Sequence, residues 1–492
     1  MQLALLIPLL AAGASAACPT LSVSLEDGIV RGFISSENPD VRQFLGIPYA
    51  KPPVGALRFE APQPIGHFGS VDAKALPPSC PQSGSPLPLI YNRDVLEFNI
   101  GGLNGTGATD EDCLTISVWS PAKTAAAGRL PVLLYIYGGG FTSGGEDVPY
   151  QTPTQWVQRT QAHVVVSFNY RVGFFGFPSA SGLPGTKHNP GLLDQRLAVE
   201  WVAKNIAAFG GDPDRIVLWG QSAGGASVAS YAYAYPNDPI VKGFIQMSGT
   251  EYLLGFSESL SPSSFTTVAN RVGCGNLTAA AELECVRLVP WQNIQCAIAD
   301  ARLAGVSLSF GPTPDEKVVF SNYTDRAIRG AVAKLPAILG TTVNDGVALA
   351  PWSVEGPSKD LILLYTKLLF LCPAVDAVGR RALAGLPTYR YRYAGNFSNI
   401  APRPWQGAYH SSELPLVFGT HPNYRGNSTA IEYATSVAMQ DTWLAFARDG
   451  AQGLQKLGWP EWVNAVDNGP IQVFGDGSGM YTGTIDDVER SC

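Results

Sequence analysis

A short serine motif bounded by glycines is the clearest place in this sequence where chemistry could occur. Residues 220–224 read GQSAG, a G-x-S-x-G pattern centred on Ser222. The motif follows an apolar, strand-like run at 215–219 (RIVLW) and precedes a helix-like stretch at 227–235. Such a strand–turn–helix junction exposes a serine hydroxyl as a nucleophile and needs small residues on both sides. An ordinary glycine-rich turn is the alternative interpretation.

A serine that attacks a carbonyl group also needs N–H donors for the negative oxygen that forms. Ala223 supplies one donor, because it directly follows the serine. The glycines at 138–140 follow another apolar run, 131–137 (PVLLYIY), and glycine lets a backbone approach a substrate closely. A nucleotide-binding loop is disfavoured, since Ser143 stands where the third glycine of G-x-G-x-x-G belongs.

Three longer stretches resemble the type-B carboxylesterase/lipase family, which includes cholinesterases and several fungal lipases. Residues 209–224 (FGGDPDRIVLWGQSAG) resemble its serine signature, and 111–121 (EDCLTISVWSP) resemble a second signature. Residues 169–173 (NYRVG) with 191–195 (GLLDQ) are also similar. The resemblance spans roughly residues 22–480 and points to a secreted fungal member. It implies an α/β-hydrolase fold, ester hydrolysis without a metal or organic cofactor, and Gly139 and Gly140 as N–H donors, with Gly138 as a further candidate.

The order serine, acid, histidine of α/β-hydrolases leaves two candidates for the base. His410 lies in 407–414 (GAYHSSEL), which resembles the family's histidine loop, whereas His421 precedes a proline in a predicted surface turn. The predicted acid is Asp345, at the end of 337–346 (AILGTTVNDG), where the family usually has glutamate. Aspartate suffices, because it need only orient the imidazole and stabilise its protonated form.

The sequence leaves the roles of three further residues undecided. Glu355 and Asp360 are fallbacks for the acid, because 344–346 (NDG) is also a plain turn sequence. Ser248 resembles a residue that supports the acid, or it is an ordinary serine at a strand end.

The elements that must position these groups alternate between strand-like and helix-like runs. Runs that are apolar on both faces predict a buried, mostly parallel sheet, with helices such as 192–208 on both of its faces. Short runs at 28–34 and 43–47 predict an added N-terminal antiparallel hairpin. We therefore expect the α/β class and a single domain over 18–492, with the site on loops at the carboxyl ends of the strands. The strand-like runs are 131–137, 163–169, 215–219, 244–247 and 337–340.

Composition and the N-terminus predict an exported protein. The chain has 492 residues, a net charge of −7 and no run of Lys or Arg, which disfavours nucleic acid and anionic membrane surfaces as partners. Residues 1–17 predict a signal peptide, because an apolar stretch at 3–10 precedes an A-x-A type cleavage site. Cys18 permits a lipoprotein anchor as an alternative, although Ser15 stands where a lipobox has leucine. We expect no later membrane-spanning segment, no GPI tail and an extracellular location.

Cysteines and glycosylation sequons fit export. Eight cysteines include no C-x-x-C pair of the kind used for zinc or redox chemistry. The family resemblance implies the bridges Cys80–Cys113 and Cys274–Cys285. The other four cysteines allow three pairings, of which Cys372–Cys492 resembles a bridge in some relatives; the remaining two are Cys18 and Cys296. Five N-x-S/T sequons predict a glycoprotein, at Asn104, Asn276, Asn322, Asn396 and Asn427.

Two departures from the family bear on the substrate. Gln221 stands where many relatives carry glutamate, and residues 80–113 contain no tryptophan for cation–π binding of choline. Both disfavour a cholinesterase. We therefore predict a carboxylesterase or lipase for neutral, fairly apolar esters, either small molecules or lipids. The sequence leaves the oligomeric state open. A non-catalytic adhesion module and a peptide or amide hydrolase are the competing hypotheses.

Overall fold

The computed structural model describes residues 21–82, 89–90, 93–94, 109–123, 129–184, 188–252, 263–423, 425–462 and 469–492. The predicted signal peptide, Cys18 and the sequon at Asn104 lie outside the described residues.

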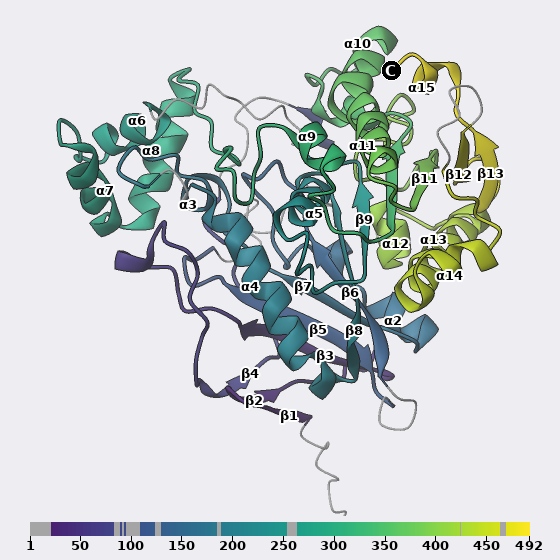
Figure 1. The fold of residues 1–492 in the computed structure, drawn as a ribbon, viewed down its shortest axis with the longest axis horizontal. Coiled ribbons are helices and arrows are strands. Elements are labelled where there is room, and N and C mark those ends of the chain that lie inside the picture. The colour runs from purple at the N-terminus through teal and green to yellow at the C-terminus, as the bar shows by residue number, and fades with distance from the viewer. Residues whose placement is uncertain are drawn as a thin grey trace, which may run out of the picture.

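A large mixed sheet forms the centre of the molecule (Figure 1). Within the described residues it has ten strands in the order β13-β12-β11-β10-β9-β8-β6-β7-β5-β3. The strands from β7 to β12 run parallel, and β3, β5 and β13 are antiparallel to their neighbours. The strands are β3 (Val41–Pro48), β5 (Thr115–Pro121), β6 (Leu130–Ile136), β7 (Val164–Phe168), β8 (Gly211–Gln221), β9 (Gly243–Met247), β10 (Ala337–Thr342), β11 (Thr388–Tyr393), β12 (Pro470–Phe474) and β13 (Met480–Thr484).

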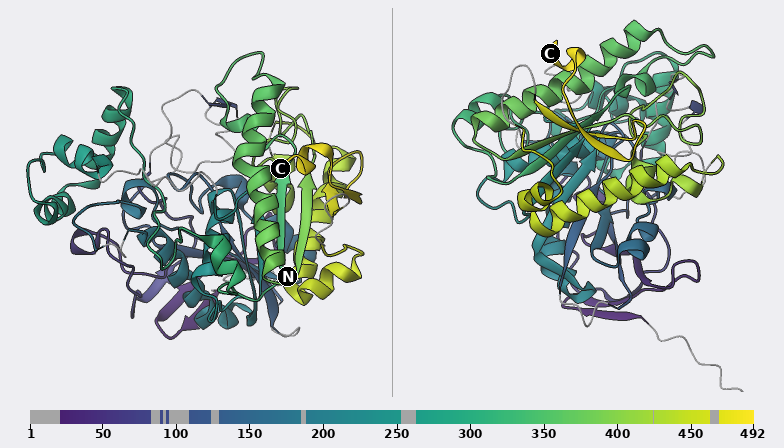
Figure 2. Two further views of the ribbon diagram at one scale, coloured as in Figure 1. Left: turned by 45° about the horizontal axis from the view of Figure 1, so that its top comes forward. Right: turned by 90° about the vertical axis from the view of Figure 1, so that its right-hand side faces the viewer.

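Helices cover both faces of this sheet. The right-hand view of Figure 2 shows the strands between α11 and α13. Helices α4, α5 and α11 contact strands β6 and β8 to β11. Helices α2 and α13 also contact strands of the sheet, and α12 packs against α2 and α13. The helices are α2 (Thr154–Thr160), α3 (Gly173–Gly176), α4 (Pro190–Asn205), α5 (Ala223–Ala234), α6 (Ser263–Arg271), α7 (Ala279–Leu288), α8 (Trp291–Leu303), α9 (Tyr323–Ile328), α10 (Lys359–Thr366), α11 (Cys372–Leu383), α12 (Leu414–Phe418), α13 (Ala430–Asp449), α14 (Ala451–Lys456) and α15 (Asp487–Arg490).

Single helical turns, mostly 3₁₀, connect several of these elements. A π-helical turn, η7 (Lys367–Leu371), joins α10 to α11. The 3₁₀ turns are η1 (Gly55–Leu57), η4 (Pro149–Gln151), η5 (Ile206–Phe209), η6 (Asp345–Leu349) and η8 (His421–Asn423).

The predicted α/β-hydrolase architecture is confirmed, and each predicted strand of the parallel core is present. The reason is burial: β7 and β9 are buried along their whole length, as expected of strands covered on both faces. The predicted helix at 192–208 is α4, which begins at Pro190 and continues into the turn η5. Gly210 ends this unit in a left-handed conformation (φ 94°).

The N-terminal strands pair differently from a simple hairpin between 28–34 and 43–47. β2 (Gly28–Arg31) pairs antiparallel with β1 (Ser22–Leu25) and parallel with β4 (Gly69–Asp72), which makes a separate three-stranded sheet. Within the described residues, the backbones of the two predicted runs pair at a single bridge between Phe33 and Gln43. From Val41 onward β3 pairs with β5 at the edge of the main sheet, where Val41 and Phe44 are fully buried.

Helices α6, α7 and α8 lie to one side of the sheet and bury an apolar cluster of their own (Figure 1). Phe59 and Phe174 belong to this cluster, and their rings meet edge to face with centroids 5.5 Å apart. The disulfide Cys274–Cys285 ties α6 to α7 within it.

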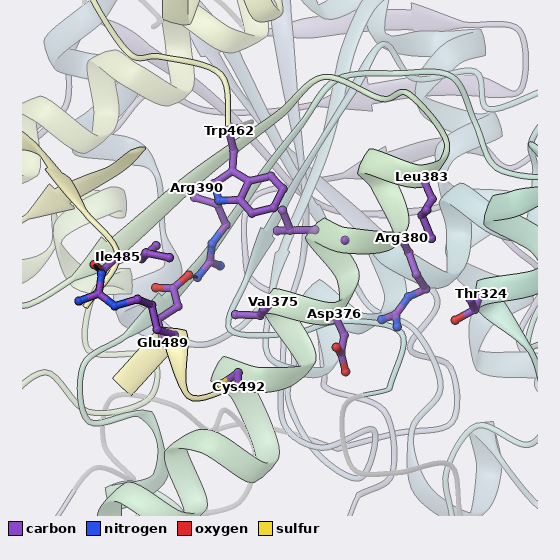
Figure 3. A pocket seen from close by; sticks show the side chains of 13 residues that line it. Thr324, Val375, Asp376, Arg380, Leu383, Arg390, Trp462, Ile485, Glu489 and Cys492 are labelled. Carbon is purple, nitrogen blue, oxygen red and sulfur yellow. Dashed lines mark hydrogen bonds and ion pairs between the residues drawn. The ribbon is translucent and has the colours of Figure 1, made fainter. Parts of the chain in front are cut away.

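The C-terminal segment is fastened against α11 and β11. The disulfide Cys372–Cys492 and a buried ion pair hold it there, with Arg390 Nη2 and Glu489 Oε1 2.7 Å apart. A pocket of about 420 Å³ lies between the C-terminal segment and α11. Figure 3 shows the side chains that line it, among them Trp462 and Arg380. No predicted catalytic or oxyanion-hole residue lines this pocket.

One helical stretch of the described residues, Lys359–Leu383, is long and apolar enough to cross a membrane by length and composition alone. From the sequence we expected no such segment. Its second half, α11, packs on β10 and β11. Arg381 is buried in α11 and donates to Thr388 Oγ1, so we interpret the stretch as a helix of the folded core.

Candidate active site

Ser222 occupies a sharp turn between β8 and α5. Its backbone has φ 58° and ψ −123°, a conformation that is strained for a residue with a side chain. Gly224 permits the turn, because a Cβ there would lie 2.0 Å from the backbone oxygen of Ile136. The Ser222 N–H donates to Met247 O at 2.8 Å, and the side chain stays 9% exposed. The local structure is that of a nucleophile elbow.

Asp345 and His410 lie in direct contact. Asp345 opens η6 just after β10, and His410 lies in the loop between β11 and α12. Asp345 Oδ1 is 2.8 Å from His410 Nδ1, and the two side chains are 0% and 4% exposed. Asp345 Oδ2 accepts from Ser248 Oγ and from the Thr342 N–H, both at 2.9 Å. A carboxylate held in this way requires the proton on Nδ1, so Nε2 of His410 is the nitrogen that accepts.

The alternatives from the sequence are not at this position. Glu355 is exposed in the segment before α10, and Asp360 is exposed in the first turn of α10. His421 is buried, with Nδ1 2.7 Å from Ser428 Oγ, so the predicted surface turn was wrong. Burial lowers the pKa of His421 to about 4. Ser248 contacts the predicted acid directly and is therefore more than a serine at a strand end.

The glycine loop after β6 faces the turn that carries Ser222. Gly139 and Gly140 have φ values of 112° and 63°, which favour glycine. A Cβ on Gly138 would lie 2.7 Å from Gln221 O and 2.9 Å from Ser222 Cβ, so this loop packs directly on the elbow. Gly138, Ser222, Ser248, Asp345 and His410 follow β6, β8, β9, β10 and β11, whose carboxyl ends form one edge of the sheet.

Two contacts of His410 were not foreseen from the sequence. Phe370, on the π-helical turn η7, packs its ring against the imidazole with centroids 4.3 Å apart. Gln221, which is 2% exposed, places its Nε2 3.2 Å from His410 Nε2. Phe370 belongs to a buried apolar cluster beside the elbow, whose other members are Phe141, Phe177, Leu192, Ala223, Ala226, Val318 and Val319.

Comparison with known proteins identifies the family. The model of the carboxylesterase family matches residues 19–360 and 353–473. A chlorogenic acid esterase of Aspergillus niger is 46% identical over 95% of this chain and 93% of its own length. Secreted lipase 5 of Gibberella zeae is 42% identical over 92% of each chain. A solved structure of a PNB esterase superimposes with a TM-score of 0.79 and 26% identity, covering 96% of this chain and 99% of that chain.

The chain belongs to the carboxylesterase family. As a carboxylesterase it is a carboxylic ester hydrolase, and the family named from its motifs in the sequence is confirmed. The fold expected from that resemblance also agrees with the solved relative.

The carboxylesterase contains three disulfides among its described residues. Cys80–Cys113 and Cys274–Cys285 are the two bridges that the family resemblance implied. Cys372–Cys492 is the third, which leaves Cys296 as an exposed free thiol. The sequons at Asn276, Asn322, Asn396 and Asn427 all lie on exposed residues, as attachment of a glycan requires.

Two buried carboxyl groups of the carboxylesterase have pKa values that burial raises above their usual range. Burial, together with the negative charge of Asp345, raises the pKa of Glu413 well above its usual range. Burial raises the pKa of Glu146 to about 8, although Thr115 Oγ1 donates to it at 2.7 Å. A group whose pKa rises on folding stabilises the folded state below its unfolded pKa, and that stability is lost as the pH rises through the folded pKa.

Glu146→Gln is expected to flatten the pH dependence of stability. Glu146 has a pKa of about 8 when folded and 4.5 ordinarily, so it costs stability as the pH rises between these values. The wild-type free energy of unfolding should fall between pH 5 and pH 8 by about 3 kcal/mol more than that of the variant, as an upper bound. Urea titrations at both pH values measure this difference. The exposed Glu200→Gln is the control, and equal slopes for wild type and Glu146→Gln would contradict the assignment.

Proposed function

We propose that this carboxylesterase cleaves its ester substrates with Ser222 as nucleophile, His410 as general base and Asp345 as the acid that orients the base. The observation that carries the proposal is the 2.8 Å contact between His410 Nδ1 and Asp345 Oδ1 at the sheet edge where Ser222 lies on its elbow. Gly139, Gly140 and Ala223 are the proposed donors of the oxyanion hole. Residues 18–492 form the proposed catalytic domain.

The reaction follows from the tautomer of His410. With the proton on Nδ1, Nε2 accepts the proton of Ser222 while the serine oxygen attacks the ester carbonyl. The carbonyl oxygen becomes negative in the tetrahedral intermediate and is stabilised by the backbone N–H groups. The intermediate expels the alcohol, which takes its proton from His410, and an acyl-enzyme remains. Water then repeats the sequence and releases the acid.

The proposed substrates are neutral, fairly apolar esters. The apolar cluster beside the elbow, with Phe141, Phe177 and Phe370, supports an apolar acyl group. The relatives' names, a chlorogenic acid esterase and a secreted lipase, support aromatic plant esters and lipid esters as the two classes to compare. The secreted relatives and the three disulfides support export through the predicted signal peptide at 1–17 and glycosylation at the exposed sequons.

A substrate panel tests this proposal. p-Nitrophenyl esters of acetate, butyrate, octanoate and palmitate are compared with methyl esters of hydroxycinnamic acids and with a matched anilide. We expect kcat/KM for esters to exceed that for the anilide by at least about 10³, because the site is proposed to act on a good ester leaving group. An anilide that is cleaved as fast as its ester would favour amide hydrolysis. No turnover of any ester would favour the adhesion module.

A further inference from the structure

Gln221 faces the part of His410 that does the proposed chemistry. Gln221 is the last residue of β8, pairs with Met247 of β9 and is 2% exposed. Its side-chain Nε2 lies 3.2 Å from His410 Nε2. On the other side, its Oε1 lies 3.0 Å from the Cβ that an alanine would have at position 138. The amide therefore lies between the base and the glycine loop.

The direction of this hydrogen bond follows from Asp345. The carboxylate accepts Nδ1–H, so Nε2 of the resting imidazole has only an electron pair, and the Gln221 amide donates to it. A hydrogen bond to the uncharged form of a group opposes protonation of that group. A glutamate in the same place would have the opposite effect, because a carboxylate close to the ring stabilises the imidazolium.

Residue 221 is the neighbour of His410 at which a substitution would most change the charge around the imidazole. Asp345 holds Nδ1 from η6, and Glu413 lies three residues further along the same loop with its pKa raised well above its usual range. From β11, the pKa of Tyr391 is also raised, first by burial and then by Glu413 and Asp345. Phe370 of η7 presents only an apolar ring. Among these neighbours in the described chain, the one fixed negative charge is Asp345.

We propose that Gln221 is a specificity-determining residue, whose amide donates to the neutral form of His410 and adds no negative charge beside it, so that the site accepts esters that carry a carboxylate as well as neutral ones. The inference rests on the proposed role of His410 as base. It extends the proposed substrate class from neutral esters to anionic ones.

Gln221→Glu tests the inference, because it changes one amide into a carboxylate of nearly equal shape. The acid limb of kcat/KM against pH should move up by about one pH unit or more, since an opposite charge within a few ångströms favours the imidazolium. The ratio of kcat/KM for mono-p-nitrophenyl succinate to that for p-nitrophenyl butyrate should fall at least about fivefold at a pH above the limb. An unmoved limb or an unchanged ratio would overturn the proposal.

Two further variants keep the test decisive. Gln246→Glu places a carboxylate on the neighbouring strand, where residue 246 pairs with Gly220 and its side chain points to the opposite face from that of Gln221. Its acid limb should stay within about 0.3 pH unit of wild type. If Gln221→Glu does not fold, Gln221→Met removes the donor without adding charge, and its limb should move up by a smaller amount. A limb that does not move in Gln221→Met then overturns the proposal.

Ser222→Ala is measured in the same assay to separate this inference from the proposed function. If Ser222→Ala is inactive while the limb of Gln221→Glu is unmoved, only the role of Gln221 is wrong. If Ser222→Ala remains active, the proposed function itself is wrong.

Discussion

Ser222→Ala is expected to lose ester hydrolysis by a factor of at least about 10⁴ in kcat while the protein folds normally. The nucleophile is removed, and the base and N–H donors that remain supply only residual catalysis. The side chain is small and 9% exposed, so its loss should change the free energy of unfolding little. Initial rates with p-nitrophenyl butyrate and thermal melts of both proteins measure the two effects.

Ser227→Ala is the matched control for this prediction. Ser227 lies on α5, is 1% exposed and donates to Ala223 O at 2.8 Å, so it is a buried serine on the same helix without a proposed catalytic role. Its specific activity should stay within about threefold of wild type. Hydrolysis that survives in Ser222→Ala at more than about a hundredth of the wild-type rate would contradict the assignment of the nucleophile.

Asp345→Asn is expected to lower kcat by about 10⁴, because it changes which nitrogen of His410 carries the proton. Two donors, Ser248 Oγ and the Thr342 N–H, already point at Oδ2. The amide oxygen of an asparagine must occupy that position, and its NH₂ group then faces Nδ1 of His410. Nδ1 would have to accept a hydrogen bond from that NH₂ group, so the ring proton would lie on Nε2, which could then no longer act as a base.

The fallback acids supply the controls for Asp345→Asn. Glu355→Gln and Asp360→Asn change exposed residues and should leave kcat within about twofold of wild type. A loss of activity in either of these variants, with Asp345→Asn still active, would reassign the acid. Thermal melts of each variant separate loss of chemistry from loss of fold.

The sequence predicted best those parts of the site that contiguous residues form. The G-x-S-x-G pattern forms an elbow with the strand and helix that flank it in the sequence. The glycines with positive φ after β6 also directly follow a strand that the sequence predicts. The parallel core was equally predictable, because strands such as β7 are buried on both faces and therefore appear in the sequence as uninterrupted apolar runs.

The parts that were missed depend on contacts between distant segments. Phe370 reaches His410 from a π-helical turn, and an apolar run such as 367–371 (KLLFL) does not distinguish a π turn from an α-helix. The sequence marked Gln221 as unusual, but its contact with His410 joins residues 189 positions apart. The burial of His421 and the separate N-terminal sheet likewise follow from tertiary packing and not from local pattern.

Labelling with a fluorophosphonate, followed by peptide mass mapping, tests the central claim most directly. The reagent phosphonylates a serine only when a neighbouring base and N–H donors activate it. We predict one label per chain, on the peptide that contains Ser222, with labelling slowed at least about a hundredfold in His410→Ala. A label on another serine such as Ser248, or an enzyme that hydrolyses esters while Ser222 stays unlabelled, would contradict the account.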